Sequence, residues 1–191
     1  MMLDKIRANL EDHRRTVEML TNEHVAVISR MSEMIAESLG KGGKLLLAGN
    51  GGSAADAQHV AGEFVGRLVY DRRPLPAIAL STDTSVLTCV GNDYGFDDVF
   101  LRQTEALAAE GDVFWGFSTS GQSGNVVAAA KAAKAKGARV LAFTGEKGGT
   151  LAEVADVTFR SPASRTMRIQ EIHMLAYHII CQLVEESLCP R

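Results

Sequence analysis

The feature that most constrains the fold is a change of rhythm at Lys44, after which short apolar runs alternate with longer helical stretches. The apolar runs are 44–48, 76–80, 112–117, 138–144 and 156–159. The helical stretches between them are 54–68, 84–109 with an interruption near Gly91, 125–136 and 150–155. This alternation indicates a parallel sheet covered by helices on both faces. Right-handed crossovers then produce a doubly wound α/β fold, with ligands at the carboxyl ends of the strands.

Residues 1–41 precede this core and predict two amphipathic helices. Apolar residues recur at helical spacing around Ile6 and Leu10, and again from Val25 to Leu39, where Gly40 ends the second helix. Two such helices either pack on a partner subunit or cover one side of their own sheet. The chain closes with a further long helix, predicted over 166–188.

Size and charge limit the class of protein. A chain of 191 residues is long enough for one domain with a full core. Its 20 basic and 23 acidic residues leave a net charge of −3, which gives no support to nucleic acid as the partner. No apolar run approaches the roughly 20 residues that span a bilayer, and the N-terminus lacks a signal-peptide core. We therefore expect a soluble protein with no membrane partner.

Three cysteines without C-x-x-C spacing are typical of reduced thiols in a cytoplasmic protein. They are Cys89, Cys181 and Cys189. Since Cys89 and Cys181 lie in apolar runs, both are expected to be small buried hydrophobic residues.

A candidate acid/base or metal site follows the first predicted strand. The glycine-rich turn 49–53 leads into a helical segment in which His59 and Glu63 are four residues apart. On a helix their side chains meet on one face, about 6 Å apart along the axis. An imidazole and a carboxylate at this spacing can hold a metal ion or act as a base with its partner. The glycine-rich turn before this helix offers backbone N–H groups to an anion. An anion-binding turn next to an acid/base pair suggests chemistry on a phosphorylated small molecule.

A second loop follows the third predicted strand. Its four hydroxyl side chains precede a helix that begins near Asn125, and they are Ser118, Thr119, Ser120 and Ser123. The helix N-terminus adds unpaired N–H groups and a partial positive charge. One hydroxyl would suffice to cap this helix. The pattern therefore favours a phosphate monoester as the ligand of this loop.

Two further features leave alternatives open. Asn92 and Asp93 follow an apolar run and, taken alone, predict an ordinary turn. Gln170 and His178 lie eight residues apart in the last helix, about 12 Å along the axis, so both reach one ion only at full stretch. Either that helix begins after Gln170, or the two residues serve differently, or neighbouring chains contribute to each site.

Five segments in combination resemble the sugar isomerase (SIS) domain family over nearly the whole chain. They are 49–53, 58–64, 90–96, 116–121 and 168–173, with the sequences GNGGS, QHVAGEF, VGNDYGF, GFSTSG and RIQEIH. The resemblance implies one SIS domain over residues 1–191, in which 1–41 takes part in oligomerisation and 44–191 is the α/β core. It further implies a three-layer α/β/α sandwich with a five-stranded parallel sheet, assembled as a homotetramer with sites at subunit interfaces.

The resemblance implies an aldose–ketose isomerase that converts sedoheptulose 7-phosphate to D-glycero-D-manno-heptose 7-phosphate. This reaction opens ADP- or GDP-heptose biosynthesis for lipopolysaccharide or other surface glycans. Glu63 and His178 match the acid/base pair of the family. One zinc ion per subunit would be held by residues that match His59, Glu63, Gln170 and His178. The substrate contacts would come from Asn50, Gly51, Gly52, Ser53, Glu63, Asn92, Asp93, Ser118, Thr119, Ser120, Ser123 and Gln170.

Two alternatives to this enzyme are open at the level of the sequence. Residues 161–167 are similar to a non-catalytic relative that binds the replication initiator DnaA, so the chain could be a tetrameric scaffold. A scaffold has no need for both Glu63 and His178, which favours the enzyme. The other alternative is an isomerase of a different sugar phosphate, because no single residue fixes the number of carbons.

Overall fold

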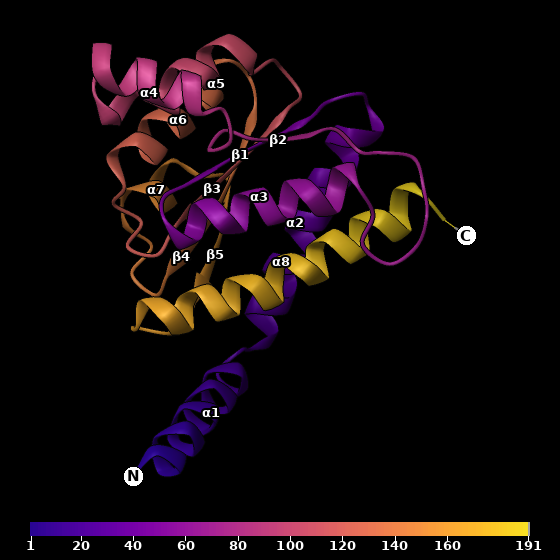
Figure 1. The fold of residues 1–191 in the computed structure, drawn as a ribbon. Coiled ribbons are helices and arrows are strands. Elements are labelled where there is room, and N and C mark those ends of the chain that lie inside the picture. The colour runs from indigo at the N-terminus through magenta and orange to yellow at the C-terminus, as the bar shows by residue number, and fades with distance from the viewer. Residues whose placement is uncertain (191) are drawn as a thin grey trace.

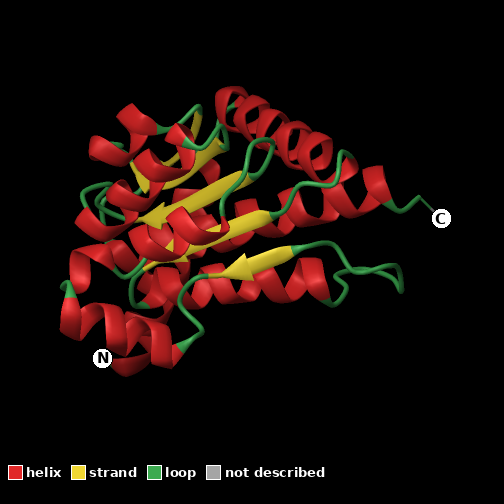
Figure 2. Ribbon diagram, turned by 90° about the horizontal axis from the view of Figure 1, so that it is seen from above, coloured by secondary structure: helices red, strands yellow, loops and turns green. Residues whose placement is uncertain are grey.

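The computed structural model describes residues 1–190, and its helices and strands alternate as the sequence predicts (Figures 1 and 2). The helices are α1 (Met2–Glu18), α2 (Asn22–Gly40), α3 (Gly52–Val65), α4 (Thr84–Asp93), α5 (Leu101–Leu107), α6 (Gly124–Ala135), α7 (Gly149–Val154) and α8 (Thr166–Leu188), with a 3₁₀ turn η1 (Phe96–Asp98). The strands are β1 (Leu45–Gly49), β2 (Ala77–Ala79), β3 (Val113–Ser118), β4 (Arg139–Gly145) and β5 (Val157–Ser161).

The five strands form one parallel sheet in the order β2-β1-β3-β4-β5. This confirms the predicted doubly wound fold. From β1 the chain forms β2 at one edge of the sheet. It then returns to the other side of β1 and adds β3, β4 and β5 in turn, so the topological switch lies between β1 and β3. Gly49 at the end of β1 is in register with Phe117 in β3. The loops that follow these two strands are therefore neighbours at the place where doubly wound sheets bind ligands.

Alternate residues of each strand enter two separate cores, which makes three layers. In β1, Leu45 and Leu47 pack with α2, α3 and α8, whereas Leu46 and Ala48 pack on the other face with α4 to α7. Successive side chains of a strand point to opposite faces, so a run that is apolar throughout needs helices on both. Figure 1 shows α3 and α8 side by side on one face of the sheet.

The two N-terminal helices play different parts. Helix α2 buries Met31, Ile35 and Leu39 in its own core, so it covers one side of its own sheet. Helix α1 instead stands out from the body (Figure 1) and meets the start of α8 through Arg168. The Arg168 guanidinium donates to Asp12 Oδ2 at 2.7 Å and to the backbone oxygen of Asn9 at 2.9 Å. Helix α1 also has exposed apolar residues, of which Ile6 and Leu10 line a pocket together with Met167 of α8.

Two local predictions are wrong. Asn92 and Asp93 do not form a turn after Gly91, because α4 continues through them and the break comes at Gly95, whose φ is +111°. A glycine within a helix costs only about 1 kcal/mol relative to alanine, whereas positive φ is a conformation that glycine adopts freely. Cys89 is exposed rather than buried, since it lies on the outer face of α4, while Cys181 is buried as expected. None of the helices within residues 1–190 combines the length and apolarity needed to cross a bilayer.

Candidate active site

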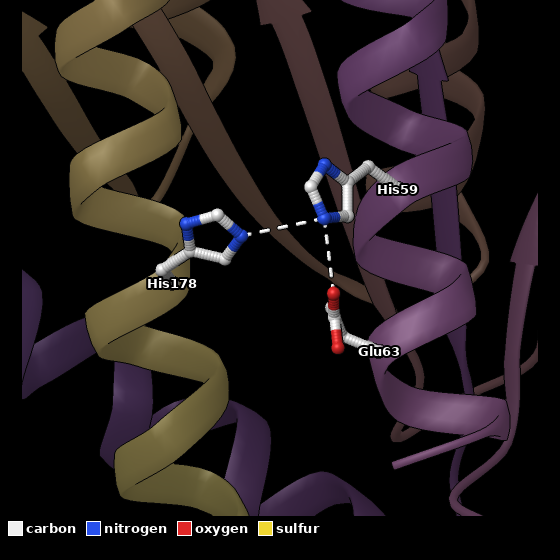
Figure 3. Close-up of side chains that lie close together, drawn as sticks. All are labelled: His59, Glu63 and His178. Carbon is white, nitrogen blue, oxygen red and sulfur yellow. Dashed lines mark hydrogen bonds and ion pairs between the residues drawn. The ribbon is translucent and has the colours of Figure 1, made fainter. Parts of the chain in front are cut away.

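The chemistry-bearing cluster lies between α3 and α8 (Figure 3). His59 Nε2 is 2.9 Å from Glu63 Oε1, one turn further along α3. His178 Nε2 reaches across from α8 to within 3.3 Å of His59 Nε2. One ligand atom from each of the three side chains lies within 4.8 Å of the others. The helical spacing of His59 and Glu63 thus does bring them together, and α8 supplies the third group.

Helix packing sets this geometry. The inner side of α3 places Ala57, Val60 and Phe64 in the same core cluster as Ala176 and Ile180 of α8. With 3.6 residues per turn, the positions before each of these α3 residues face sideways toward α8. The core contacts therefore hold the two helices at the separation that brings the imidazoles and the carboxylate together.

The donor set of the cluster fits a divalent cation such as zinc. Two imidazole nitrogens and a carboxylate oxygen are ligands that zinc takes in proteins, and a catalytic site keeps a further position open. Burial, followed by the nearby His59, holds the pKa of His178 below its usual value. A neutral imidazole can bind a cation or accept a proton. The same three groups therefore suit metal ligation and proton transfer.

Gln170, the fourth residue of the predicted metal set, lies elsewhere. Helix α8 runs without interruption from Thr166 to Leu188, so a helix that begins after Gln170 is excluded. Its side chain packs against the first residue of α3, where a Cβ built on Gly52 would lie 2.3 Å from Gln170 Nε2. Gln170 thus stands at the opposite end of α3 from Glu63, beside the glycine-rich turn.

The hydroxyl loop after β3 forms a small polar cradle. Ser118 Oγ is 2.9 Å from Ser123 Oγ and 3.4 Å from Ser120 Oγ. Ser123 occupies the N-cap position of α6, yet its side chain makes no capping hydrogen bond. The hydroxyls therefore do not serve merely as a cap. Thr119 and Ser120 also line a pocket of about 360 Å³ that extends to Thr166 of α8.

The glycine-rich turn after β1 and the hydroxyl loop after β3 are joined by hydrogen bonds between two side-chain amides. Asn50 Nδ2 donates to Asn125 Oδ1 at 2.8 Å, and Asn125 Nδ2 donates to Asn50 Oδ1 at 3.0 Å. Gly51, with φ of +55°, provides the turn, and Ser53 Oγ belongs to a buried side chain in the first turn of α3. Sequence reasoning missed Asn125, whose only local signal is that it begins the helix after a loop of hydroxyls.

Asn92 and Asp93 are the predicted substrate contacts that the structure does not bring to these loops. Both are exposed, and Asn92 Nδ2 donates to Asp93 Oδ1 at 2.8 Å. Asp93 Oδ2 in turn lies 3.6 Å from Cys89 Sγ. Another carboxylate does approach the cradle, because a Cβ on Gly124 would lie 3.1 Å from Asp97 Oδ1. Sequence reasoning did not single out Asp97.

A buried pair lies behind His59 that sequence reasoning also missed. The Tyr177 hydroxyl is 3.0 Å from His59 Nδ1, and the Asp56 carboxylate lies near enough to the phenol for the two groups to influence each other's pKa. Burial raises the pKa of Asp56 to about 6, against the lowering effects of His59 and Tyr177. Burial and the Asp56 charge raise the pKa of the Tyr177 hydroxyl, which keeps it protonated.

Comparisons with known proteins agree with this architecture. A sequence model described as the SIS domain matches residues 10–145. A phosphoheptose isomerase of Geobacter sulfurreducens is 51% identical over 189 residues, covering 99% of this chain and all of that protein. A phosphoheptose isomerase of Aquifex aeolicus is 49% identical over 190 residues, with both chains fully covered. The solved structure of phosphoheptose isomerase from Neisseria gonorrhoeae superposes with a TM-score of 0.92 at 42% identity, covering 97% of this chain and all of that one.

These matches extend over almost the entire length of the chain. The chain belongs to the SIS domain family and groups within it with the phosphoheptose isomerases.

Proposed function

We propose that this protein is an aldose–ketose isomerase that converts sedoheptulose 7-phosphate to D-glycero-D-manno-heptose 7-phosphate, at the start of nucleotide-activated heptose synthesis. The observations that support the proposal are the convergence of His59, Glu63 and His178 between α3 and α8 and the cluster of serine hydroxyls before α6. Relatives at 49–51% identity bear the name phosphoheptose isomerase, which supports the seven-carbon substrate.

The reaction moves one proton between neighbouring carbons through an enediol. Glu63 takes the proton from C1 of the ketose and returns it to C2. His178 moves a proton between the oxygens on these carbons, so that the carbonyl shifts from C2 to C1. Both groups lie within reach of one sugar edge, because their side chains converge on His59.

The phosphate end orients the sugar. The hydroxyls of Ser118, Ser120 and Ser123 and the N-terminus of α6 present donors to the phosphate without a lysine in the loop. Binding energy gained there holds C1 and C2 at the distant acid/base pair. Gln170, whose side chain lies beside Gly52, would contact sugar hydroxyls.

His59, Glu63 and His178 would hold one zinc ion, which would polarise the carbonyl and stabilise the developing negative charge. A carboxylate that ligates an ion is a weaker base, so Glu63 would have to leave the ion when it accepts a proton. Gln170 joins the ligand set only if its side chain leaves Gly52.

The active form is proposed to be a homotetramer with sites close to the interfaces. Helix α8 exposes apolar side chains on either side of His178, and they are Met174, Leu175, Ile179 and Leu183. Helix α1 exposes Leu3, Ile6 and Leu10. Apolar stripes of this kind mark surfaces that bind protein. The cysteines are free thiols, which suits an enzyme of the cytoplasm.

Incubation of the purified protein with sedoheptulose 7-phosphate tests the proposal directly. We expect aldose formation, and a slower rate after treatment with a chelator that is restored by added Zn²⁺. We expect Glu63→Gln to lower turnover by at least about 10³-fold without loss of the fold, because it removes the base and retains the shape. A scaffold would show no turnover with any sugar phosphate. A near-normal rate for Glu63→Gln would remove that carboxylate as the base.

A further inference from the structure

Helix α3 carries a buried carboxylate that the proposed reaction does not use. Asp56 is 6% exposed and shares one side of the helix with His59 and Glu63, at positions i, i+3 and i+7. Its Oδ2 atom is fully enclosed and lacks a close partner within residues 1–190. A buried carboxylate is costly unless a donor serves it. The Tyr177 hydroxyl is the donor at hand.

Tyr177 links this carboxylate to the site. Its side chain is fully buried, and its hydroxyl faces His59 Nδ1 at 3.0 Å as well as Asp56. A phenol has one proton to donate, and a carboxylate can only accept. The proton therefore goes to Asp56, and the phenol oxygen is left to accept a hydrogen bond from Nδ1–H of His59.

This hydrogen bond determines the protonation of Nε2, the other ring nitrogen of His59. In a neutral ring with Nδ1 protonated, Nε2 carries a lone pair. That atom faces Glu63 Oε1 at 2.9 Å and His178 Nε2 at 3.3 Å. With Nδ1 protonated, His59 Nε2 and Glu63 Oε1 are two acceptors at 2.9 Å without a proton between them, and a divalent cation is an occupant that resolves their repulsion.

We propose that Asp56 and Tyr177 are positioning residues that hold His59 in the Nδ1–H tautomer and so present Nε2 to a divalent cation. The proposal rests on the proposed function only in assigning that cation to the catalytic cluster. Partners of this kind behind a ligating histidine fix the ring and raise its basicity.

Zinc affinity without substrate is the first test. Metal-free protein is titrated with Zn²⁺ in competition with a chromophoric chelator. We expect Tyr177→Phe to weaken binding by about 10- to 100-fold, because the ring remains and the hydroxyl is lost. The matched control is Tyr70→Phe, since the Tyr70 hydroxyl donates to the Cys189 carbonyl after α8 at 2.6 Å. Equal affinities for Tyr177→Phe and wild type would overturn the proposal.

A reversed donor provides the sharper test. In Asp56→Asn the amide can donate to the phenol oxygen, which turns the phenol proton toward Nδ1 and places a proton on Nε2. We therefore expect Asp56→Asn to bind Zn²⁺ more weakly than Tyr177→Phe. Adding Tyr177→Phe to Asp56→Asn should recover affinity to the level of Tyr177→Phe alone. Losses that simply add would show that the two residues act independently.

Nitrogen NMR of the metal-free protein reads the tautomer itself. We expect a protonated Nδ1 and an unprotonated Nε2 for His59, with the pattern lost in Tyr177→Phe and retained in Tyr70→Phe. The opposite tautomer in the wild type would overturn the relay whatever the activity. If wild-type protein bound no Zn²⁺ and still isomerised sugar, the cation assignment would be wrong and the proposal with it, while the isomerase would stand.

Discussion

At the scale of single residues, His173 links the fold to pH. It is fully buried among Phe117, Phe143 and Phe159, and its Nε2–H donates to the Thr144 carbonyl at 3.0 Å. Burial lowers its pKa to about 4, against the raising effect of that hydrogen bond. In the unfolded chain the ring takes up a proton near its ordinary pKa of about 6.5. The unfolded state therefore binds more protons between these values.

We expect His173 to contribute stability that is fully present above pH 6.5 and is lost as the pH falls toward 4. The loss amounts to about 3 kcal/mol in the free energy of unfolding. Urea titrations at several pH values measure it, and His173→Gln should flatten this part of the dependence. An unchanged slope in that variant would assign the effect to other groups.

Ser120 allows a test of the phosphate cradle at a single hydroxyl. Its side chain is exposed at the loop, so Ser120→Ala removes a donor with little effect on packing. We expect KM to rise about tenfold with kcat nearly unchanged, as loss of one hydrogen bond to a charged group predicts. Ser85→Ala, an equal change on the exposed part of α4, should leave both constants unaltered. Equal KM values for the two variants would place the phosphate elsewhere.

Local spacing was enough to predict some of the site residues but not others. His59 and Glu63 are neighbours on one helix, so the period of 3.6 brings them together without knowledge of the fold. Asp56 and Tyr177, and likewise Asn50 and Asn125, meet only after α3 has packed on α8 or β1 on β3. Each of these residues is unremarkable in its own segment, which is why sequence reasoning passed over Asp56, Tyr177 and Asn125.

At the scale of the elements, a buried ion pair couples the ends of α3 and α8. The Arg72 side chain is 3% exposed and donates to the carbonyls of Glu63 at 2.6 Å and Phe64 at 2.7 Å. Glu185 of α8 is 1% exposed, lies 3.4 Å from Arg72 Nε and accepts from Val69 N at 3.0 Å. Carbonyls in the last turn of a helix have no partner within the helix, and in α3 the Arg72 side chain supplies the hydrogen bonds to two of them.

Removal of Arg72 leaves the buried Glu185 carboxylate without its counter-ion. We expect Arg72→Met to lower the free energy of unfolding by about 3–5 kcal/mol. Arg67→Met, which removes an exposed arginine from the same loop, should change it by less than about 0.5 kcal/mol. Chemical denaturation measures both. Similar small losses would mean that the pair contributes little.

The elements themselves were largely predictable, and their exceptions have local causes. Strands that are buried on both faces must be apolar throughout, so the runs stood out against amphipathic helices. The break after α4 was misplaced because Gly91 fits within a helix, whereas the positive φ of Gly95 has no separate signature in the sequence. Cys89 was misjudged because α4 is short and one of its sides faces solvent.

At the scale of the whole molecule, α1 provides the test of assembly. Ile6 is 50% and Leu10 67% exposed on a helix that stands out from the body (Figure 1). We expect the double variant Ile6→Asp/Leu10→Asp to reduce the mass found by light scattering from four chains to fewer, with circular dichroism unchanged. Arg7→Ala on the same helix should keep the wild-type mass. An unchanged mass for the double variant would exclude this surface from the interface.

The parallel sheet and the family followed from the sequence, since alternation and motifs extend along the chain and depend on no partner. The oligomeric state stays a prediction. Its signals are exposed apolar residues such as Ile6 on α1 and Ile179 on α8, and these are visible only once the fold shows that the core of the chain does not cover them.

Helix α8 follows all five strands in the chain, and this order has a consequence for synthesis. This helix supplies His178 and Tyr177 to the site, and it covers one side of the sheet with Ile172, Ile180 and Val184. A nascent polypeptide leaving the ribosome therefore contains all five strands, the glycine-rich turn and the hydroxyl loop before it contains the helix that covers that side of the sheet. Translation that stops short would yield an inert product with a bare hydrophobic surface, a substrate for chaperones and proteases.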